Sequence, residues 1–523
     1  MKPIDMNATD YNAEYLGLSR LCLMENAGKA LADEVTTIST YKFSKPVKII
    51  IFTGSGGNAG DGFVAARHLL NRGFPVEIQM LTPPNNLKHS DTIVNYRILE
   101  NTQPHFQSLK INQVLDSNDL KNIKTTDIQN PEEDITEAII IDAILGTGIK
   151  GKLKTLVRST IEYINNVSAL KVSVDVPSGL DPETGDIVDI AVEPDYTVSF
   201  HKVKDGVRSA GEAKVGGLVI SDIGIPLEAE IFVGDGDLLR LKKRDPSSHK
   251  GSNGKVLVVG GSEDYTGAPA LAGLTALATG ADLAYIACPE SAQEPIKSYS
   301  PDIIVKSLKG DILNIENQEE ILKLVDEVDC VLLGCGSGQK EETRILFNSL
   351  AVKIKKPLVL DADALKLIDF NLIKNNPEII ITPHMREMEL FFQEKIQKHH
   401  SLSDEIDNLE PSKLRMRIAG IQKITNQIKG TILLKGRYDL IFQKNNFKLN
   451  KTGSPFMTVG GTGDCLAGMV TALRAQNNTS FDAATLAAFL LGKAGELAGK
   501  ELSEGLTASQ LPKYIPLTLK KIK

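Results

Sequence analysis

Short apolar runs, each of which ends in glycine or aspartate, restrict the possible folds of this chain more than any other feature. Residues 46–52 form one such run. A glycine-rich loop (53–62), a helical pattern (63–70) and a second apolar run (76–81) follow it. Strands of a parallel sheet have continuous apolar sequences because helices cover both faces of the sheet. This order predicts a βαβ unit, and open α/β sheets bind ligands where such strands end.

The second half of the chain repeats this alternation of strands and helices. Its expected strands lead into glycine or polar turns within residues 254–262, 330–338, 357–363, 379–384 and 431–437. A chain of 523 residues is too long for one hydrophobic core. We therefore predict an α/β fold with two doubly wound, three-layer domains. A polar, charged stretch at 234–249 has the composition of a linker or a surface arm, so we place the domains at 1–235 and 236–523.

The composition argues against several classes of partner. The net charge is −7 and the basic residues are dispersed, so neither nucleic acid nor a membrane surface is indicated. The sequence contains neither a signal-peptide pattern nor an apolar stretch long enough to cross a bilayer. The five cysteines lack paired zinc spacing. We expect a cytoplasmic protein that binds neither nucleic acid nor membrane.

Polar side chains gather at three expected strand ends in the first half. Asn58 and Asp61 lie in the glycine-rich loop, and Asp142, Asp175 and Ser178 follow two further apolar runs. The loop fits neither the P-loop nor the dinucleotide fingerprint. Each carboxylate alone could simply cap a loop or helix. Because parallel strands end at the same edge, we expect all five side chains in one crevice, suited to a polar ligand or a hard cation.

A glycine-rich turn at 458–463 leads directly into an apolar helical segment in the second half. Its glycines allow close approach to a ligand, and the N–H groups at a helix start attract anions. Asp464 could take a proton, hold a metal ion or merely cap the helix. His384 and Lys435 follow other strands and are expected at the same edge. A structural histidine and a surface lysine are the simpler readings of these two residues.

Five motifs in the first 230 residues resemble those of NAD(P)H-hydrate epimerases. They are Met-Glu-Asn-Ala-Gly (24–28), Gly-Ser-Gly-Gly-Asn-Ala-Gly-Asp-Gly (54–62), Ile-Asp-Ala-Ile-Leu-Gly-Thr-Gly (141–148), Asp-Val-Pro-Ser-Gly-Leu-Asp (175–181) and Ser-Asp-Ile-Gly-Ile-Pro (221–226). Gly57 and Ala59 replace the family's usual Asn and Gly.

This resemblance implies a Rossmann-like domain that interconverts the R and S forms of hydrated NADH and NADPH (NADHX and NADPHX). It implies a potassium site at Asn58, Asp142 and Ser178. Asp142 and Asp175 are both candidates for the proton-transfer residue. The implied substrate-binding residues are Gly57, Asn58, Ala59, Gly60, Asp61, Gly146, Thr147, Gly148, Ile149, Lys150, Gly151, Lys152 and Asp175.

Residues 245–520 resemble ribokinase-like proteins, and within them the ADP/ATP-dependent NAD(P)H-hydrate dehydratases. The motifs are His-Lys-Gly-Ser-Asn-Gly (249–254), Gly-Ser-Glu-Asp-Tyr-Thr-Gly-Ala-Pro (261–269), Thr-Pro-His (382–384), Leu-Lys-Gly (434–436) and Gly-Thr-Gly-Asp (461–464). Met385 and Arg386 stand where the family usually has a smaller turn.

This second resemblance implies that Asp464 deprotonates the ring hydroxyl of the S hydrate, which then attacks the terminal phosphate of ADP or ATP. A magnesium ion is implied beside the phosphates. The implied contacts to the hydrate are Ala268, Gly336, His384 and Asp464. The implied contacts to the nucleotide are Lys435, Gly436, Arg437, Tyr438, Asp439 and Gly463.

Together the two resemblances imply a bifunctional repair enzyme. The first domain would supply the epimer that the second domain dehydrates, giving NAD(P)H, phosphate and AMP from ADP (or ADP from ATP). A homo-oligomer is expected from the family. The alternative is a ribokinase-like small-molecule kinase with an N-terminal binding or assembly module.

Overall fold

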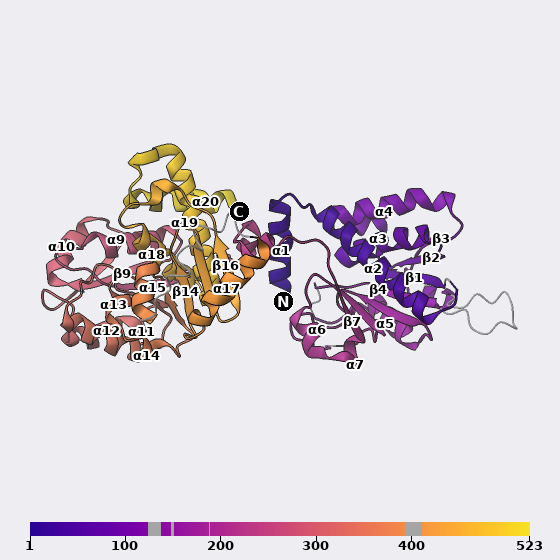
Figure 1. Ribbon diagram of the computed structural model, residues 1–523, viewed down its shortest axis with the longest axis horizontal. Coiled ribbons are helices and arrows are strands. Elements are labelled where there is room, and N and C mark those ends of the chain that lie inside the picture. The colour runs from indigo at the N-terminus through magenta and orange to yellow at the C-terminus, as the bar shows by residue number, and fades with distance from the viewer. Residues whose placement is uncertain (46, 124–137, 148–150, 188, 393–409, 523) are drawn as a thin grey trace. The chain divides into compact units, whose positions relative to one another are not determined.

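The computed structural model describes residues 1–45, 47–123, 138–147, 151–187, 189–392 and 410–522 (Figure 1). The chain forms two compact units, Met1–Pro226 and Leu227–Lys523. Each unit contains one sheet with helices packed on both faces. The predicted fold, two three-layer α/β domains, is therefore confirmed.

The sheet of the first unit has seven parallel strands in the order β3-β2-β1-β4-β5-β6-β7. The chain builds outward from β1 to β3 and then returns to place β4 beside β1. Ligands bind at such a switch point in Rossmann-like sheets. The strands are β1 Lys48–Thr53, β2 Val76–Met80, β3 Leu109–Gln113, β4 Ala138–Ala143, β5 Leu170–Val174, β6 Tyr196–Phe200 and β7 Gly217–Ser221.

Helices cover both faces of this sheet. Ile161 and Ile164 of α5 pack against Ile50, Phe52 and Ile140 on one face, whereas α3 packs against β1, β2 and β4 on the other. The helices are α1 Pro3–Tyr15, α2 Arg20–Lys42, α3 Gly57–Asn71, α4 Ser90–Thr102, α5 Thr155–Asn166, α6 Asp205–Ala210 and α7 Glu212–Val215.

The glycine-rich segment after β1 differs from its prediction as a loop. Helix α3 begins at Gly57, and its first two turns contain most of the glycines. A Cβ at Gly60 would lie 2.4 Å from Sδ of Met24, and one at Gly62 would lie 3.0 Å from Cβ of Ala143. These glycines permit close packing of α3, rather than an unusual backbone conformation.

The second unit has a nine-stranded sheet in the order β10-β9-β8-β11-β12-β13-β14-β15-β16. It is parallel except for the final hairpin β14-β15-β16. Its strand order reverses between β8 and β11. The strands are β8 Lys255–Val259, β9 Leu283–Pro289, β10 Ile304–Leu308, β11 Cys330–Leu333, β12 Leu358–Leu360, β13 Ile379–Ile381, β14 Thr431–Leu434, β15 Asp439–Gln443 and β16 Asn446–Asn450.

Alternate strand residues of this sheet enter two separate cores. Val256 and Val258 pack with α9, α18 and α19, whereas Leu257 and Val259 pack with α11, α12 and α17. The helices are α8 Leu227–Ile231, α9 Gly267–Ala278, α10 Glu290–Ser298, α11 Gln318–Asp326, α12 Glu341–Lys353, α13 Ala364–Leu367, α14 Phe370–Ile373, α15 Met385–Phe392, α17 Pro411–Thr425, α18 Thr462–Ala475, α19 Ser480–Leu502 and α20 Leu511–Ile522.

The segment that begins at residue 227 belongs to the second unit. The backbone N–H of Val233 donates to the carbonyl of Leu449 at 2.9 Å. Asp237 is fully buried and pairs with Arg240 and Lys448. The linker interpretation is therefore wrong for residues 234–240, because the burial of this ion-pair network cannot be read from local composition, whereas residues 242–247 are exposed, as expected of a surface arm. Among the described helices, none has the length and apolarity needed to cross a membrane.

Candidate functional site

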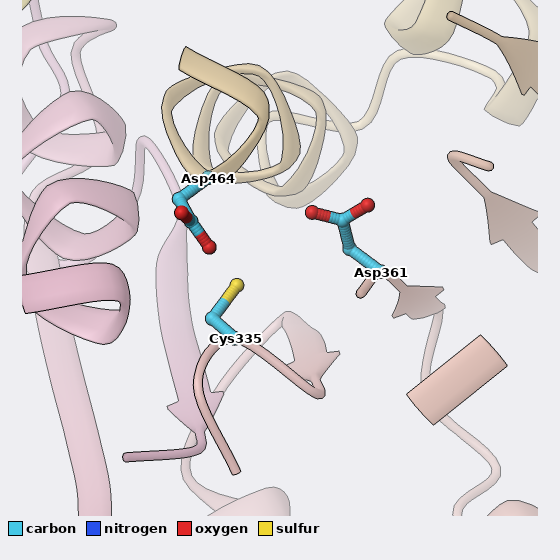
Figure 2. Close-up of side chains that lie close together, drawn as sticks. All are labelled: Cys335, Asp361 and Asp464. Atoms are coloured by element: carbon cyan, nitrogen blue, oxygen red, sulfur yellow. The ribbon is translucent and has the colours of Figure 1, made fainter. Parts of the chain in front are cut away.

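Three side chains from the second unit meet where α18 begins. Asp464 lies in the first turn of α18, Cys335 follows β11 and Asp361 follows β12. The Cys335 sulfur and one oxygen of each carboxylate lie within 4.8 Å of one another. Figure 2 shows all three side chains directed into the same space. Two charged carboxylates at this separation repel by about 3 kcal/mol at an effective dielectric constant near 20.

Close helix packing fixes the backbone at Asp464. Gly461 caps α18 with φ +95°, a left-handed conformation that favours glycine. A Cβ at Gly468 would lie 2.2 Å from the carbonyl oxygen of Ala272, so α18 and α9 approach closely there. Within the predicted turn itself, a Cβ at Gly461 would lie 2.6 Å from Cδ1 of Leu271 in α9, so the turn also permits this helix docking.

A lysine neutralises one of the two carboxylates. Nζ of Lys435 lies 2.7 Å from Oδ1 of Asp361, and the hydroxyl of Thr382 donates to the same oxygen at 2.8 Å. Burial lowers the pKa of Lys435, but the Asp361 charge and hydrogen bond outweigh it, so the net pKa is raised. Lys435 therefore stays protonated and positively charged.

Asp464 has the opposite environment. Burial raises its pKa to about 6, and the nearby Asp361 charge adds to the increase. A hydrogen bond with the Cys335 thiol opposes this shift. Burial, Asp464 and Asp361 together raise the pKa of the Cys335 thiol well above its usual range. The cluster thus combines a neutral thiol with a carboxylate that can exchange a proton near neutral pH.

A cavity of about 670 Å³ opens beside this cluster. This volume is typical of sites for small molecules. All six residues predicted to contact the nucleotide lie in its wall: Lys435, Gly436, Arg437, Tyr438, Asp439 and Gly463. The carboxylate of Asp439 accepts hydrogen bonds from the N–H of Gly436 and Nδ2 of Asn450. Asp439 therefore shapes the turn of the cavity wall.

The residues predicted to contact the hydrate lie around the same sheet edge. A Cβ at Gly336 would be 3.2 Å from Cβ of Ala268, so these two segments touch. His384 pairs with Lys435 in an isolated parallel bridge. The backbone N–H of His384 donates to the buried Glu387 carboxylate at 3.0 Å. Helix α15 begins at Met385, so the bulky pair of residues after His384 lies in a first helical turn.

In the first unit, Asp142 organises the ends of β4 and β5. Its two oxygens accept from the Ser178 hydroxyl at 2.5 Å, the Ser178 N–H at 2.8 Å and the Ser173 hydroxyl at 2.9 Å. Nδ2 of Asn58 donates to the carbonyls of Leu145 and Val174, at 3.2 and 2.7 Å. The predicted potassium ligands therefore lie at one junction.

Asp175 occupies a different position beside this junction. It has φ +63°, which is uncommon for a residue with a Cβ and costs about 1–3 kcal/mol. Its Oδ1 pairs with Lys204 and accepts from the hydroxyl of Ser199 at 3.2 Å and the N–H of Phe200 at 3.3 Å. The Lys204 side chain is only 2% exposed. Asp175 is thus a strained, charge-paired carboxylate at a strand end.

Two further carboxylates interact electrostatically with Asp175. Burial raises the pKa of Asp61 well above its usual range, and the Asp175 charge raises it further. Burial raises the pKa of Asp10 to about 6, although Lys204 lowers it. Asp10 lies in α1, far in sequence from every predicted site residue. The first unit therefore places two carboxylates of raised pKa near the Asp175–Lys204 ion pair.

The remaining predicted residues fall into three groups. Gly57, Ala59 and Gly60 lie in the first turns of α3. A Cβ at Gly146 would be 2.3 Å from Oδ1 of Asn58, which places Gly146 against the predicted potassium site, followed by Thr147. Gly151 and Lys152 are exposed, and Gly148, Ile149 and Lys150 lie outside the described residues.

The sequence analysis did not select four residues of these clusters. Asp361 ends an apolar run in the same way as Asp142, so the strand-end pattern could have found it. Cys335 is one of the five cysteines without paired zinc spacing, and it is fully buried. Lys204 and Asp10 have no local pattern that distinguishes them. Only the folded chain brings these two near Asp175.

Family models match both halves of the chain. Residues 256–517 match the model described as NAD(P)H-hydrate dehydratase, and residues 20–206 match that of the YjeF-related protein N-terminus. The bifunctional NAD(P)H-hydrate repair enzyme of Methanothermobacter thermautotrophicus is 47% identical over 519 residues, covering 99% of this chain and 94% of that protein. This chain belongs to the family of bifunctional NAD(P)H-hydrate repair enzymes.

The family relationship extends to more distant members. The repair enzyme of Pyrobaculum aerophilum is 39% identical, covering 99% of this chain and 97% of that protein. Among solved structures, the Bacillus subtilis ADP/ATP-dependent NAD(P)H-hydrate dehydratase, co-crystallised with ATP and Mg²⁺, has a TM-score of 0.45 and 26% identity. That match covers 56% of this chain and 99% of the solved chain. The resemblance to repair enzymes in the sequence is confirmed by the family models and the curated relatives.

Proposed function

We propose that the second unit dehydrates the S forms of NADHX and NADPHX with ADP or ATP as phosphate donor, while the first unit interconverts the R and S forms. Membership of the repair-enzyme family supports both activities. One structural observation carries the assignment: the Asp464 carboxylate, with its pKa raised to about 6, lies at a helix start near Gly463, which lines a cavity of about 670 Å³.

In the proposed dehydration, Asp464 accepts the proton of the ring hydroxyl as its oxygen attacks the terminal phosphate. AMP or ADP leaves. Departure of the phosphate and loss of one ring proton then restore reduced nicotinamide. The N–H groups at the start of α18 and the Lys435 ammonium would stabilise the charge that develops during transfer. Positioning by these fixed groups contributes most of the rate, because phosphoryl transfer needs little covalent help from the protein.

Magnesium fits this site only in part. Mg²⁺ prefers oxygen ligands, usually one or two carboxylates with water and phosphate. Here an oxygen of Asp361 is taken by Lys435 and Thr382, and a thiol lies beside Asp464. We propose that Mg²⁺ enters with the nucleotide and is held mainly by phosphate and water. It would screen phosphate charge, and no step above depends on a protein-bound magnesium ion.

For the epimerase, the contacts of the two candidate carboxylates support Asp175 as the proton carrier. Hydrogen bonds from Ser173, Ser178 and Ile144 occupy both oxygens of Asp142. The hydrogen bonds of Asp175 are concentrated on Oδ1. Its second oxygen is therefore the better placed to take a proton. Asp142 would hold the Ser178 turn in place.

Potassium fits the junction below Asp175. Potassium sites use protein oxygens in place of water. The carbonyls of Leu145 and Val174, the side chain of Asn58 and the Ser178 hydroxyl supply such oxygens close together. Burial raises the pKa of Asp142, and a nearby cation would favour its charged form. We propose that the ion fixes these loops and takes no part in bond breaking.

The direct test mixes both NADHX epimers with the protein, Mg²⁺ and either ADP or ATP. We expect full recovery of NADH absorbance with release of free phosphate. Failure to recover NADH with either nucleotide would contradict the dehydratase proposal. Recovery of the S portion alone, with the rest converting only at the spontaneous rate, would contradict the epimerase proposal. Accumulation of a phosphorylated product would indicate a kinase instead.

Assembly and location stay predictions. A homo-oligomer is expected from the family resemblance, and light scattering of the purified protein would test it. Cytoplasmic location is expected from composition alone, and cell fractionation would test it.

A further inference from the structure

Lys435 pairs with the Asp361 carboxylate and interacts electrostatically with the carboxylates of Glu387 and Asp464. Within the described part of the chain, its ion pair is with Asp361, at 2.7 Å. Asp464 belongs to the same cluster, whose ligand atoms lie within 4.8 Å of one another. A lysine side chain is flexible, and its ammonium is a point charge without a fixed direction. The choice between Asp361 and Asp464 is therefore set by the surroundings of each carboxylate.

The surroundings hold Asp361 in place. Its side chain is only 2% exposed, and the Thr382 hydroxyl donates to the same oxygen that pairs with Lys435. The backbone N–H of Lys435 donates to the carbonyl of Pro383 at 2.8 Å. Asp361, Thr382 and Lys435 follow the neighbouring strands β12, β13 and β14. The ion pair thus bridges three strand ends.

This pairing places Nζ of Lys435 at the start of α18. A Cβ at Gly463 would lie 3.4 Å from that nitrogen, and both residues line the cavity of about 670 Å³. The ammonium is therefore next to the N–H groups that attract an anion. If Lys435 paired with Asp464 instead, its charge would be bound to the proposed proton acceptor.

We propose that Asp361 is a positioning residue that directs Lys435 toward the phosphates of the bound nucleotide and keeps it away from Asp464. The inference deepens the proposed dehydratase function and depends on it. In this arrangement Asp361 touches neither substrate. It keeps Lys435 and Asp464 from forming an ion pair with each other. Lys435 can then contact the phosphate donor, and Asp464 can accept the proton of the hydroxyl.

The test is a double-mutant cycle with Asp361→Asn and Lys435→Met. The asparagine can still accept the Thr382 hydrogen bond but lacks the charge that holds Lys435. We expect Asp361→Asn to lower kcat about 100-fold and to weaken ADP or ATP binding about 10-fold, because Lys435 turns to Asp464. Adding Lys435→Met should raise kcat about 10-fold above that of Asp361→Asn alone, because the blocking ammonium is gone.

Two readouts separate positioning from a general loss of stability. In Asp361→Asn, the acid limb of the pH–rate profile should move to lower pH, since the Asp361 charge that raises the pKa of Asp464 is lost and a cation beside Asp464 favours its charged form. The control Asp237→Asn breaks a fully buried ion pair with Lys448 elsewhere in the unit. It should lower stability and leave kcat within about threefold of wild type. Thr382→Val, which removes the second anchor of Asp361, should lower kcat in the same direction by a smaller factor.

Additive effects in the cycle, or a kcat for Asp361→Asn within threefold of wild type, would overturn the proposal. Should Asp361→Asn fail to fold, Thr382→Val and its combination with Lys435→Met decide by the same comparison. Nucleotide affinity is measured by calorimetry without the hydrate. A wild-type protein that never yields NADH therefore contradicts the proposed function, while the affinity cycle still judges Asp361.

Discussion

Both units place an aspartate–lysine ion pair near the ends of parallel strands, but the aspartate that the lysine binds has a different proposed role in each unit. In the first unit, Lys204 binds Asp175, the residue proposed to carry the proton. In the second unit, Lys435 binds Asp361 and leaves Asp464 without an ion pair among the described residues. The same two residue types therefore give two electrostatic arrangements.

This difference in ion pairing shows how the surroundings of each carboxylate suit its proposed role. Asp175 is paired with a cation, and burial raises the pKa values of its neighbours Asp61 and Asp10, that of Asp10 to about 6. Such a set suits proton exchange in both directions, as an epimerisation needs. The pKa of Asp464 is itself raised to about 6, and among the described residues no cation forms an ion pair with it. It suits a base that acts once per phosphate transferred.

The largest expected effect comes from Asp464→Asn. Loss of the proton acceptor should lower NADH recovery about 1,000-fold, while epimerisation in the first unit continues at the wild-type rate. Absorbance at constant protein concentration measures the recovery of NADH, and separation of the epimers measures the rate of epimerisation. Calorimetry with ADP or ATP should give a nearly unchanged affinity. Joint loss of binding and turnover would point to a structural role for Asp464.

Lys204→Met breaks the ion pair of the first unit. Asp175 would remain as a buried charge without its partner, so the free energy of unfolding should fall by about 3 kcal/mol. Urea denaturation, followed at the unfolding transition of the first unit, measures this change. Lys435→Met should cost less stability, because the Lys435 side chain is 20% exposed and that of Lys204 only 2%. Equal losses would contradict the contrast between the units.

Asp175→Asn and Asp142→Ala separate catalysis from loop support. Asp175→Asn should slow epimerisation about 100-fold. It should also lower the free energy of unfolding by about 3 kcal/mol, because Lys204 would remain as a buried charge without its partner. Asp142→Ala leaves the donors of Ser173 and Ser178 unsatisfied, so it should lower the free energy of unfolding by about 2 kcal/mol. Epimer separation distinguishes the two variants, because only Asp175→Asn removes the proposed proton carrier, and thermal unfolding measures both losses of stability. If Asp175→Asn epimerises at the wild-type rate, Asp142 becomes the candidate for the proton carrier instead.

The smallest expected effect is a pH dependence confined to the second unit's reaction. Asp464 must be ionised to accept a proton, and its pKa is raised to about 6 by burial and Asp361. The rate should therefore be level above pH 6 and fall about tenfold for each pH unit below it. Stopped-flow recovery of NADH from pure S hydrate at several pH values tests this. A plateau that extended to pH 4 would contradict the raised pKa.

The sequence predicted some of these features well and others poorly, for identifiable reasons. Continuous apolar runs predicted both parallel sheets. The rule that parallel strands end at one edge predicted that Asn58, Asp142 and Ser178 lie together, and they lie at one junction. The glycine segment at 54–62 was assigned to a loop, because glycine does not reveal whether it permits a bend or a close helix contact. Burial of Asp237 in a supposed linker was equally hidden from composition.

The sequence by itself determined which groups could do chemistry, because strand ends, glycine turns and the family motifs are local patterns. The family resemblance also predicted six of the residues that line the cavity of about 670 Å³. Only the tertiary structure decided which aspartate each lysine neutralises. Lys204 is 29 residues from Asp175, and Lys435 is 74 residues from Asp361. Ion pairs over such separations follow from strand order and burial, and these properties arise only when the whole sheet has formed.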